Sequence, residues 1–298
     1  MMETSTVPFT QLAAAAQAQI SAALESYTNL PVDCPPRLAE AIRYSLLAPG
    51  KRLRPLLVLM AAEACGGNSE AAMPAACAVE MVHAYSLIHD DLPCMDDDDM
   101  RRGRPTCHKA FGEALAVLAG DALLTMAFEV LSRDVRPARV AADCCLELAR
   151  AAGPAALVGG QADDLDGTSV AGDINRLEAI HRRKTGAMIQ VSIRLGAMIV
   201  RASRRQRSAL EKYGQRLGLA FQITDDLLDV GGNEQALGKR AGKDADRGKL
   251  TFPGLLGVDE SRRRAEQLIA EALAAVASLG PQAEGLEALA RAVLERNH

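Results

Sequence analysis

Two aspartate-rich segments are the most chemically distinctive feature of this sequence of 298 residues. The first begins at Asp90 and the second at Asp225. In the second segment, Asp225 and Asp229 are four residues apart, so on a helix they share one face, and the leucines between them pack on the other. Two carboxylates ~4 Å apart repel by about 1 kcal/mol in water and by about 4 kcal/mol at an effective dielectric constant of 20. We therefore expect a cation there, and ligands that are all oxygen favour Mg²⁺ or Ca²⁺ over zinc.

The first segment needs a break in its helix before its carboxylates can meet. Asp90 and Asp96 are six residues apart, roughly 240° around an ideal helix, and would not share a face. Pro93 removes a backbone donor and crowds the preceding turn, so the helix should kink or end there and Asp96 could return toward Asp90. Arg101 and Arg102 follow and supply guanidinium groups suited to a metal-bound phosphate.

The acidic and glycine-rich segments also allow simpler interpretations. An EF-hand loop requires glycine at its sixth position, and neither acidic segment has one. A nucleotide-binding P-loop at residues 232–239 fails because the glycine spacing is wrong and arginine follows the lysine. A solvated or purely structural acidic bundle remains open as an alternative, because acidic runs are commonly exposed loops or helix ends.

Composition predicts an all-α protein. The chain is rich in the strong helix formers Ala, Leu, Glu and Arg, has 3% aromatic residues and contains no tryptophan. Its net charge of −4 gives no general attraction to nucleic acid. Seven cysteines without a CxxC pair indicate a reducing compartment, so we expect a cytoplasmic protein. We expect no signal peptide, and no wholly apolar run approaches the ~18 residues that a membrane span needs.

The elements that must position these residues are predicted from helical periodicity. Segments 53–64 and 73–91 are apolar almost all round, which indicates helices at the centre of a bundle. Polar residues rich in Gly and Lys over 231–251 predict a mobile loop between helices. No repeat or linker composition divides the chain, so we expect one domain over residues 1–298. The predicted helices cover residues 9–24, 37–47, 53–64, 73–91, 110–133, 139–152, 173–196, 206–230, 262–277 and 283–295.

Four motifs taken together resemble the signature set of trans-isoprenyl diphosphate synthases. They are Gly50-Lys-Arg-Leu-Arg-Pro55, the first aspartate segment with its Arg-Arg-Gly tail, Lys184-Thr-Gly186, and Phe221 to Asp229. They occur in the family's order between about residues 50 and 253. The four residues between the first Asp pair and Asp96 are similar to bacterial farnesyl diphosphate synthases and plant-type geranylgeranyl diphosphate synthases. The resemblance implies a single bundle of mainly antiparallel helices around a central apolar cavity, with the aspartate motifs facing each other across its mouth.

The resemblance also implies a metal site that holds the allylic diphosphate. Three Mg²⁺ ions would bridge the two aspartate motifs to that diphosphate, and six carboxylates would roughly balance their charge. The metal-ligand candidates are Asp90, Asp91, Asp96, Asp225, Asp226 and Asp229. By the same resemblance, the catalytic candidates are Asp90, Asp91, Asp96, Lys184, Thr185, Gln222 and Asp225.

The remaining site residues follow from the same resemblance. Thr185 and Gln222 would place oxygen atoms near the developing carbocation, and Gln161 with Asp164 resembles a pair in the cavity wall. The residues implied for the homoallylic diphosphate are Gly50, Lys51, Arg54, His83 and Arg102. Those implied for the allylic diphosphate are Arg101, Lys184 and Lys239, with Lys249 as a further diphosphate or loop lysine.

The implied reaction is a Mg²⁺-dependent 1′–4 condensation of isopentenyl diphosphate with dimethylallyl or geranyl diphosphate to give farnesyl diphosphate. Tyr85 lies five residues before Asp90, ~7.5 Å deeper on a straight helix. With Ser86, it is the candidate floor that limits chain length.

The alternatives are a geranylgeranyl diphosphate synthase, a non-catalytic subunit of a heteromeric synthase, and a terpene cyclase, although a cyclase normally carries an Asn/Ser/Glu triad at the second motif. The family is homodimeric, so a homodimer is expected, with no nucleic-acid partner and no membrane span.

Overall fold

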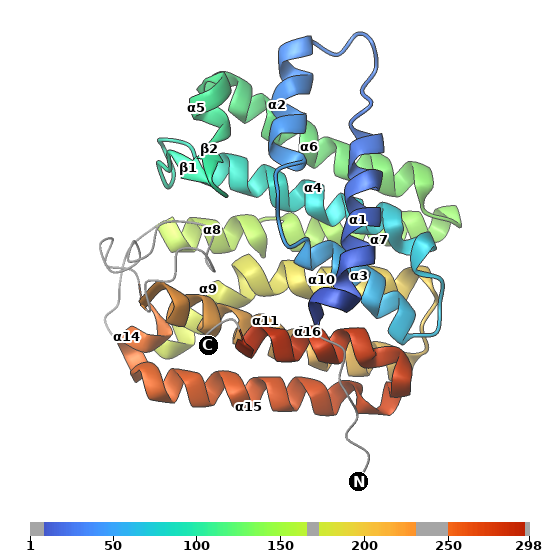
Figure 1. Cartoon of the computed structure of the whole chain (residues 1–298), viewed down its shortest axis with the longest axis vertical. Helices are drawn as coiled ribbons and strands as arrows, with labels where there is room; N and C mark the ends of the chain where they lie inside the picture. The colour runs from blue at the N-terminus through green and yellow to red at the C-terminus, as the bar shows by residue number, and fades with distance from the viewer. Residues whose placement is uncertain (1–8, 166–172, 231–249, 296–298) are drawn as a thin grey trace.

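Helices form nearly all of the regular structure in the computed structural model of this chain, which describes residues 9–165, 173–230 and 250–295 (Figure 1). Strands β1 (Met100–Arg101) and β2 (Arg104–Pro105) form one short antiparallel hairpin. The prediction of an all-α bundle is therefore confirmed. The helices are α1 (Phe9–Tyr27), α2 (Pro36–Leu46), α3 (Leu53–Ala64), η1 (Ser69–Ala72), α4 (Met73–Asp90), α5 (Cys107–Phe111), α6 (Glu113–Asp134), α7 (Ala138–Ala152), α8 (Leu157–Leu165), α9 (Ile174–His181), η2 (Arg182–Gly186), α10 (Ala187–Ile199), α11 (Arg204–Val230), α14 (Phe252–Leu256), α15 (Val258–Val276), η3 (Ala277–Ala283) and α16 (Glu284–Glu295).

Three apolar helices form the centre of the bundle. Most side chains of α3, α4 and α10 are buried, as their nearly continuous apolar sequences predict. Helix α4 packs against α6 and α3, while α10 packs against α3 and α11. Helices α15 and α16 cover the side of α11 in the lower part of Figure 1. A single cluster of buried side chains runs from α1 to α16.

Two predicted helices are interrupted in the structure. The segment predicted over 110–133 consists of α5 and α6, separated at Gly112, whose φ of 89° ends the first helix. The segment predicted over 173–196 contains α9 and α10 joined by η2, a π-helical turn. The periodicity of apolar residues continues through such a turn, so the sequence pattern did not indicate that the helix is interrupted there. Helices α8 and α14 were not predicted, and the loop predicted over 231–251 lies almost wholly outside the described residues.

Among the residues that the structure describes, two helical segments are long and apolar enough to cross a membrane, Ser69–Asp90 and Glu113–Asp134. Core helices of water-soluble proteins meet the same criterion, so this is weak evidence for a membrane. The first is 67% buried within the bundle, whereas the second is only 39% buried. All seven cysteines are unbridged.

Candidate active site

The first aspartate segment reverses direction directly after α4. The helix ends at Asp90, before Pro93, and the backbone amide of Asp96 donates to the carbonyl of Asp90 at 2.8 Å. The amide of Asp97 likewise donates to the carbonyl of Leu92 at 3.1 Å. The break at the proline thus brings Asp96 back to the end of the helix, as its position predicted.

Asp90 occupies a position where a carboxylate is poorly solvated. Burial raises its pKa from 3.8 to about 6, Lys184 opposes the rise, and the neighbouring Asp96 and Asp91 add to it. A half-buried carboxyl group beside other carboxylates is stabilised when a cation binds. Lys184 of η2 is therefore near enough to Asp90 to influence its charge.

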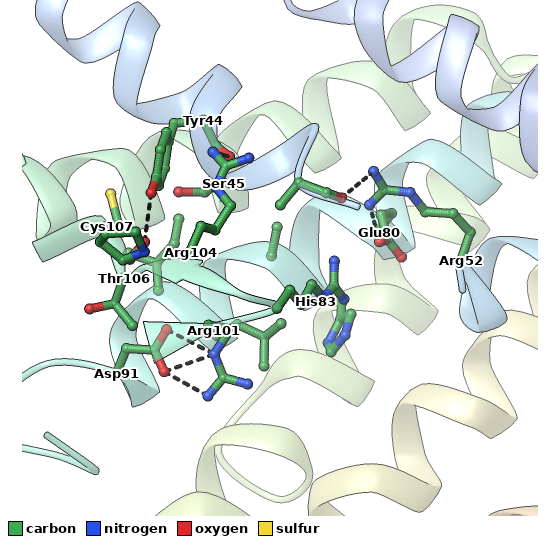
Figure 2. A pocket seen from close by; sticks show the side chains of 16 residues that line it. Tyr44, Ser45, Arg52, Glu80, His83, Asp91, Arg101, Arg104, Thr106 and Cys107 are labelled. Atoms are coloured by element: carbon green, nitrogen blue, oxygen red, sulfur yellow. Dashed lines mark hydrogen bonds and ion pairs between the residues drawn. The ribbon is translucent and has the colours of Figure 1, made fainter. Parts of the chain in front are cut away.

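Asp91 is directed toward the hairpin. Its buried carboxylate accepts hydrogen bonds from Arg101 Nε at 2.8 Å to each oxygen and from Arg101 Nη2 at 2.6 Å (Figure 2). The hairpin turns at Arg102 and Gly103, with φ angles of 52° and 78°, and pairs Arg101 with Arg104. Asp91 therefore orients Arg101 at the end of α4.

The basic residues gather around His83 on α4. Arg54 Nη1 lies 3.3 Å from His83 Nε2. Burial lowers the pKa of His83 well below its usual value, and the guanidinium groups of Arg54 and Arg102 lower it further, so the imidazole is neutral at pH 7. Burial also lowers the pKa of Arg54, while Glu80 and Asp225 act in the opposite direction. Asp225 of the second aspartate segment is therefore near enough to Arg54 to influence its charge.

The π-helical turn η2 carries Lys184 and Thr185 between the two aspartate segments. Lys184 Nζ donates to Asp164 Oδ2 on α8 at 2.8 Å. The Thr185 hydroxyl donates to Gln222 Oε1 on α11 at 2.9 Å. A Cβ atom at Gly160 of α8 would lie 2.5 Å from the backbone nitrogen of Lys184, so only glycine allows this approach of α8 to the turn.

The second aspartate segment lies on the last turns of α11. Asp225 is half-buried, whereas Asp226 and Asp229 are buried. Asp226 Oδ2 accepts from the backbone amide of Phe252 at 2.9 Å and lies 3.9 Å from His181 Nε2. The His181 ring stacks on Phe252 with centroids 5.6 Å apart. Asp226 thus fixes the start of α14 against α9 and α11.

These contacts bring most of the predicted site residues to one end of the bundle, where the hairpin, α8 and α14 lie together on the left of Figure 1. Tyr85 is buried within α4, with its ring edge-on to His89 at 5.7 Å, and Ser86 donates to the carbonyl of His83 at 2.9 Å. Lys239 and Lys249 fall outside the described residues. Among the residues that the structure describes, no three His, Cys, Asp or Glu side chains gather closely enough to hold a metal ion alone.

Sequence reasoning missed three residues that shape this site. They are Glu80, which is 2% exposed on α4, His181 beside Asp226, and Gly160 behind η2. A lone acidic residue within the largely apolar segment 73–88 was a signal for Glu80. The other two act through packing between helices distant in sequence, which periodicity does not reveal.

The geometry is that of an all-α prenyl diphosphate synthase. The chain matches the polyprenyl synthetase family over residues 35–282. It is 50% identical to geranylgeranyl pyrophosphate synthase 11 of Arabidopsis thaliana over 85% of this chain and 72% of that protein. It is 47% identical to the farnesyl diphosphate synthase of Escherichia coli K12 over 91% of each chain. The apo structure of an FPP/GFPP synthase from Zymomonas mobilis superposes with a TM-score of 0.86, 38% identity and coverage of 96% of this chain and 98% of that one. The chain therefore belongs to the polyprenyl synthetase family and is a prenyltransferase.

Proposed function

We propose that this chain is a Mg²⁺-dependent farnesyl diphosphate synthase that condenses isopentenyl diphosphate first with dimethylallyl diphosphate and then with geranyl diphosphate. The observation that carries this proposal is the position of η2. Lys184 acts on Asp90, and the adjacent Thr185 is hydrogen-bonded to Gln222, one turn before Asp225. These two relationships support a single site bordered by both aspartate segments and the lysine.

The aspartates suit Mg²⁺ shared with a diphosphate. Their donor atoms are all oxygen, and burial raises the pKa of Asp90 to about 6, so a bound cation would stabilise its ionised form. Oxygens of the allylic diphosphate would supply further ligands to the Mg²⁺ ions that these aspartates hold. Asp90, Asp96 and Asp225 are the principal proposed ligands, with Asp91, Asp226 and Asp229 in supporting positions. Bound Mg²⁺ would neutralise the charge of the diphosphate leaving group.

Arg101 and Lys184 are proposed to bind the allylic diphosphate directly, in addition to the Mg²⁺ ions held by the aspartates. Arg101 is oriented by Asp91, and Lys184 by Asp164 at 2.8 Å, so both cations are fixed before substrate binds. Lys239 and Lys249 are proposed to add positive charge to the same diphosphate. Preorganised cations of this kind stabilise negative charge as the carbon–oxygen bond breaks.

The homoallylic diphosphate is proposed to bind Lys51, Arg54 and Arg102 without metal. A Cβ atom at Gly50 would lie 2.6 Å from Arg102 Nη1, so this glycine lets the Arg102 guanidinium pack against the backbone of residue 50. His83 is neutral, as its lowered pKa requires, and lies against Arg54. Guanidinium and ammonium groups together can bind several diphosphate oxygens.

Between the two diphosphates, the reaction proceeds by ionisation, condensation and elimination. The allylic C1–O bond breaks and its electron pair leaves with diphosphate. The C3=C4 electrons of isopentenyl diphosphate form the new bond to C1, and loss of a C2 proton to the departed diphosphate creates the new double bond. The oxygens of Thr185 and Gln222 are proposed to stabilise the cation.

Product length is proposed to be fifteen carbons because the buried side chain of Tyr85 lies five residues before Asp90 on α4. The alternative product is geranylgeranyl diphosphate, since a similar relative carries that name. A non-catalytic partner subunit is the alternative of a different class. Both aspartate segments and η2 are intact here, which favours catalysis.

We also propose that the protein works in the cytoplasm as a homodimer that pairs through α6. This helix carries an 18-residue window of mean hydropathy 1.8, yet only 39% of the window is buried. Leu118 is 52% exposed and Val117 39% exposed on it. A second copy of the same helix would remove this apolar surface from water.

The test is to incubate the purified protein with isopentenyl diphosphate, Mg²⁺ and each allylic primer, and to identify the prenyl alcohols after dephosphorylation. We expect farnesol from both primers and no product in EDTA. A twenty-carbon product would favour the geranylgeranyl alternative. Absence of any product from well-folded protein would favour the partner subunit.

A further inference from the structure

Arg52 differs from its neighbours in the basic segment because its side chain is buried. Lys51 is exposed and Arg54 half-buried, whereas Arg52 is 6% exposed. Arg52 Nη1 donates to Glu80 Oε1 on α4 at 2.6 Å, and Nη2 donates to the carbonyl of Ala48 at 2.9 Å (Figure 2). Its guanidinium is thus bonded on two sides within the protein.

The backbone at Arg52 adopts a conformation that needs such support. Its φ of 48° and ψ of 38° are left-handed, and Arg52 is the N-cap of α3. A non-glycine residue in this region costs about 1–2 kcal/mol and persists where surrounding contacts hold it. The preceding carbonyl, that of Lys51, accepts from Gln17 Nε2 of α1 at 2.9 Å. The turn that separates Lys51 from Arg54 is therefore anchored to α1, to α4 and to the segment that follows α2.

Glu80 supplies a buried negative charge next to a group of arginine side chains. It lies three residues before His83 on α4, and both it and Arg52 line the small pocket of Figure 2, along with Arg101 and Arg102. Burial lowers the pKa of Arg54 and of Arg102, and in both cases Glu80 is the largest influence in the opposite direction. Glu80 thus lowers the electrostatic cost of gathering these cations in one place.

We propose that Arg52 and Glu80 form a positioning pair for the diphosphate of isopentenyl diphosphate, and that neither touches the substrate. The pair holds the left-handed turn so that Lys51 and Arg54 present their cations to the same anion. This inference rests on the proposed function, because it assumes that the basic segment binds the homoallylic diphosphate.

The experiment compares Arg52→Met, Glu80→Met and the double variant. For each, we would measure the thermal midpoint, kcat and the KM values for isopentenyl diphosphate and for geranyl diphosphate. Each single variant is expected to raise the KM for isopentenyl diphosphate about 10-fold and to leave the KM for geranyl diphosphate within about 2-fold. The double variant is expected to be no worse than the poorer single one, because the two residues act together.

Stability provides a readout that separates folding from positioning. Either single variant leaves one buried charge without its partner, so both should melt at lower temperature. The double variant should recover part of that loss while its KM for isopentenyl diphosphate stays raised. Arg216→Met, which breaks the largely exposed Arg216–Glu271 pair at 2.8 Å, is the matched control and should change neither KM. If the methionine variants fail to fold, Arg52→Lys and Glu80→Gln should fold and show smaller rises in the same KM.

Three results would overturn the inference. A double variant with the wild-type KM for isopentenyl diphosphate, or equal rises in both KM values, would leave the pair with a purely structural role. A lower KM for isopentenyl diphosphate in Glu80→Met would mean that released Arg52 binds the substrate directly. Failure of the proposed function is distinct, since wild-type protein would then form no product from isopentenyl diphosphate.

Discussion

The hydroxyl of Thr185 donates to Gln222 Oε1 at 2.9 Å and so joins the π-helical turn η2 to α11 at the level of the second aspartate segment. Thr185 is buried and Gln222 half-buried. Thr185→Val keeps the shape of the side chain but leaves the amide oxygen of Gln222 without this donor, which costs about 1–3 kcal/mol. We expect kcat to fall roughly 10-fold or more, with smaller changes in both KM values, in steady-state assays of diphosphate release.

Thr224→Val is the matched control for this substitution. Thr224 is also buried on α11, but its hydroxyl donates to the carbonyl of Phe221 in its own helix at 2.8 Å. It should therefore change kcat little. Equal losses in the two valine variants would show that the Thr185–Gln222 bond has no special part in catalysis.

Asp90 should make the metal-free protein less stable at neutral pH. Its pKa is raised by burial from 3.8 in the unfolded chain to about 6 in the fold, so the ionised form is disfavoured in the folded state. This cost is absent below pH 3.8, grows as the pH rises toward 6, and is complete above it. Asp90→Asn should therefore stabilise metal-free protein at pH 7.5 by at most about 3 kcal/mol, and by almost nothing near pH 4.

The measurement is urea unfolding in EDTA at several pH values. Asp143→Asn, at an exposed position of α7, should give no such pH-dependent gain. The Asp90 variant should also lose most of its activity, since a proposed metal ligand is gone. A lower stability of Asp90→Asn at pH 7.5 would mean that the wild-type carboxylate is already well compensated.

The sequence predicted those features that depend on neighbouring residues, and it did not predict those that depend on contacts between distant segments. Pro93 acts locally, so the end of α4 and the return of Asp96 to Asp90 were predictable. The turn η2 was not, because one extra residue in a helical turn leaves the apolar pattern of 173–196 almost unchanged. Asp91 shows the same limit, since the family resemblance made it a metal-ligand candidate but did not reveal its bonds to Arg101. Hydrogen-bond partners of this kind depend on how the hairpin packs against α4, and the spacing of residues in the sequence does not reveal that packing.

Tyr85 offers a direct test of the proposed chain-length limit. It is buried on α4, five residues before Asp90, and its ring contacts His89. Tyr85→Ala removes most of an aromatic side chain, so we expect product length to shift from fifteen toward twenty carbons, as measured by chromatography of the dephosphorylated products. Unchanged fifteen-carbon product from the variant would mean that Tyr85 packs laterally and limits nothing.

Gly160 tests whether η2 must pack closely against α8. An added Cβ would lie 2.5 Å from the nitrogen and 2.9 Å from the Cα of Lys184, which are backbone atoms that cannot rotate away. Gly160→Ala should therefore displace Lys184 and lower kcat by about 10- to 100-fold, since small displacements of positioned groups are costly. Gly285→Ala is the control, because its Cβ would meet the flexible side chain of Met60 at 3.2 Å. Comparable kcat values for the two alanine variants would contradict this role for Gly160.

Leu118 tests the proposed pairing of two copies through α6. The side chain is 52% exposed on a helix that is strongly apolar, so a glutamate there would place a charge within the proposed interface. We expect light scattering to give a dimer for the wild type and a monomer for Leu118→Glu at micromolar concentration. Val258→Glu, at a 41% exposed position of α15 on the other side of the bundle in Figure 1, should remain dimeric. A Leu118→Glu protein that stays dimeric would place the interface on another surface, because a charge buried between two copies of α6 could not be tolerated without a partner.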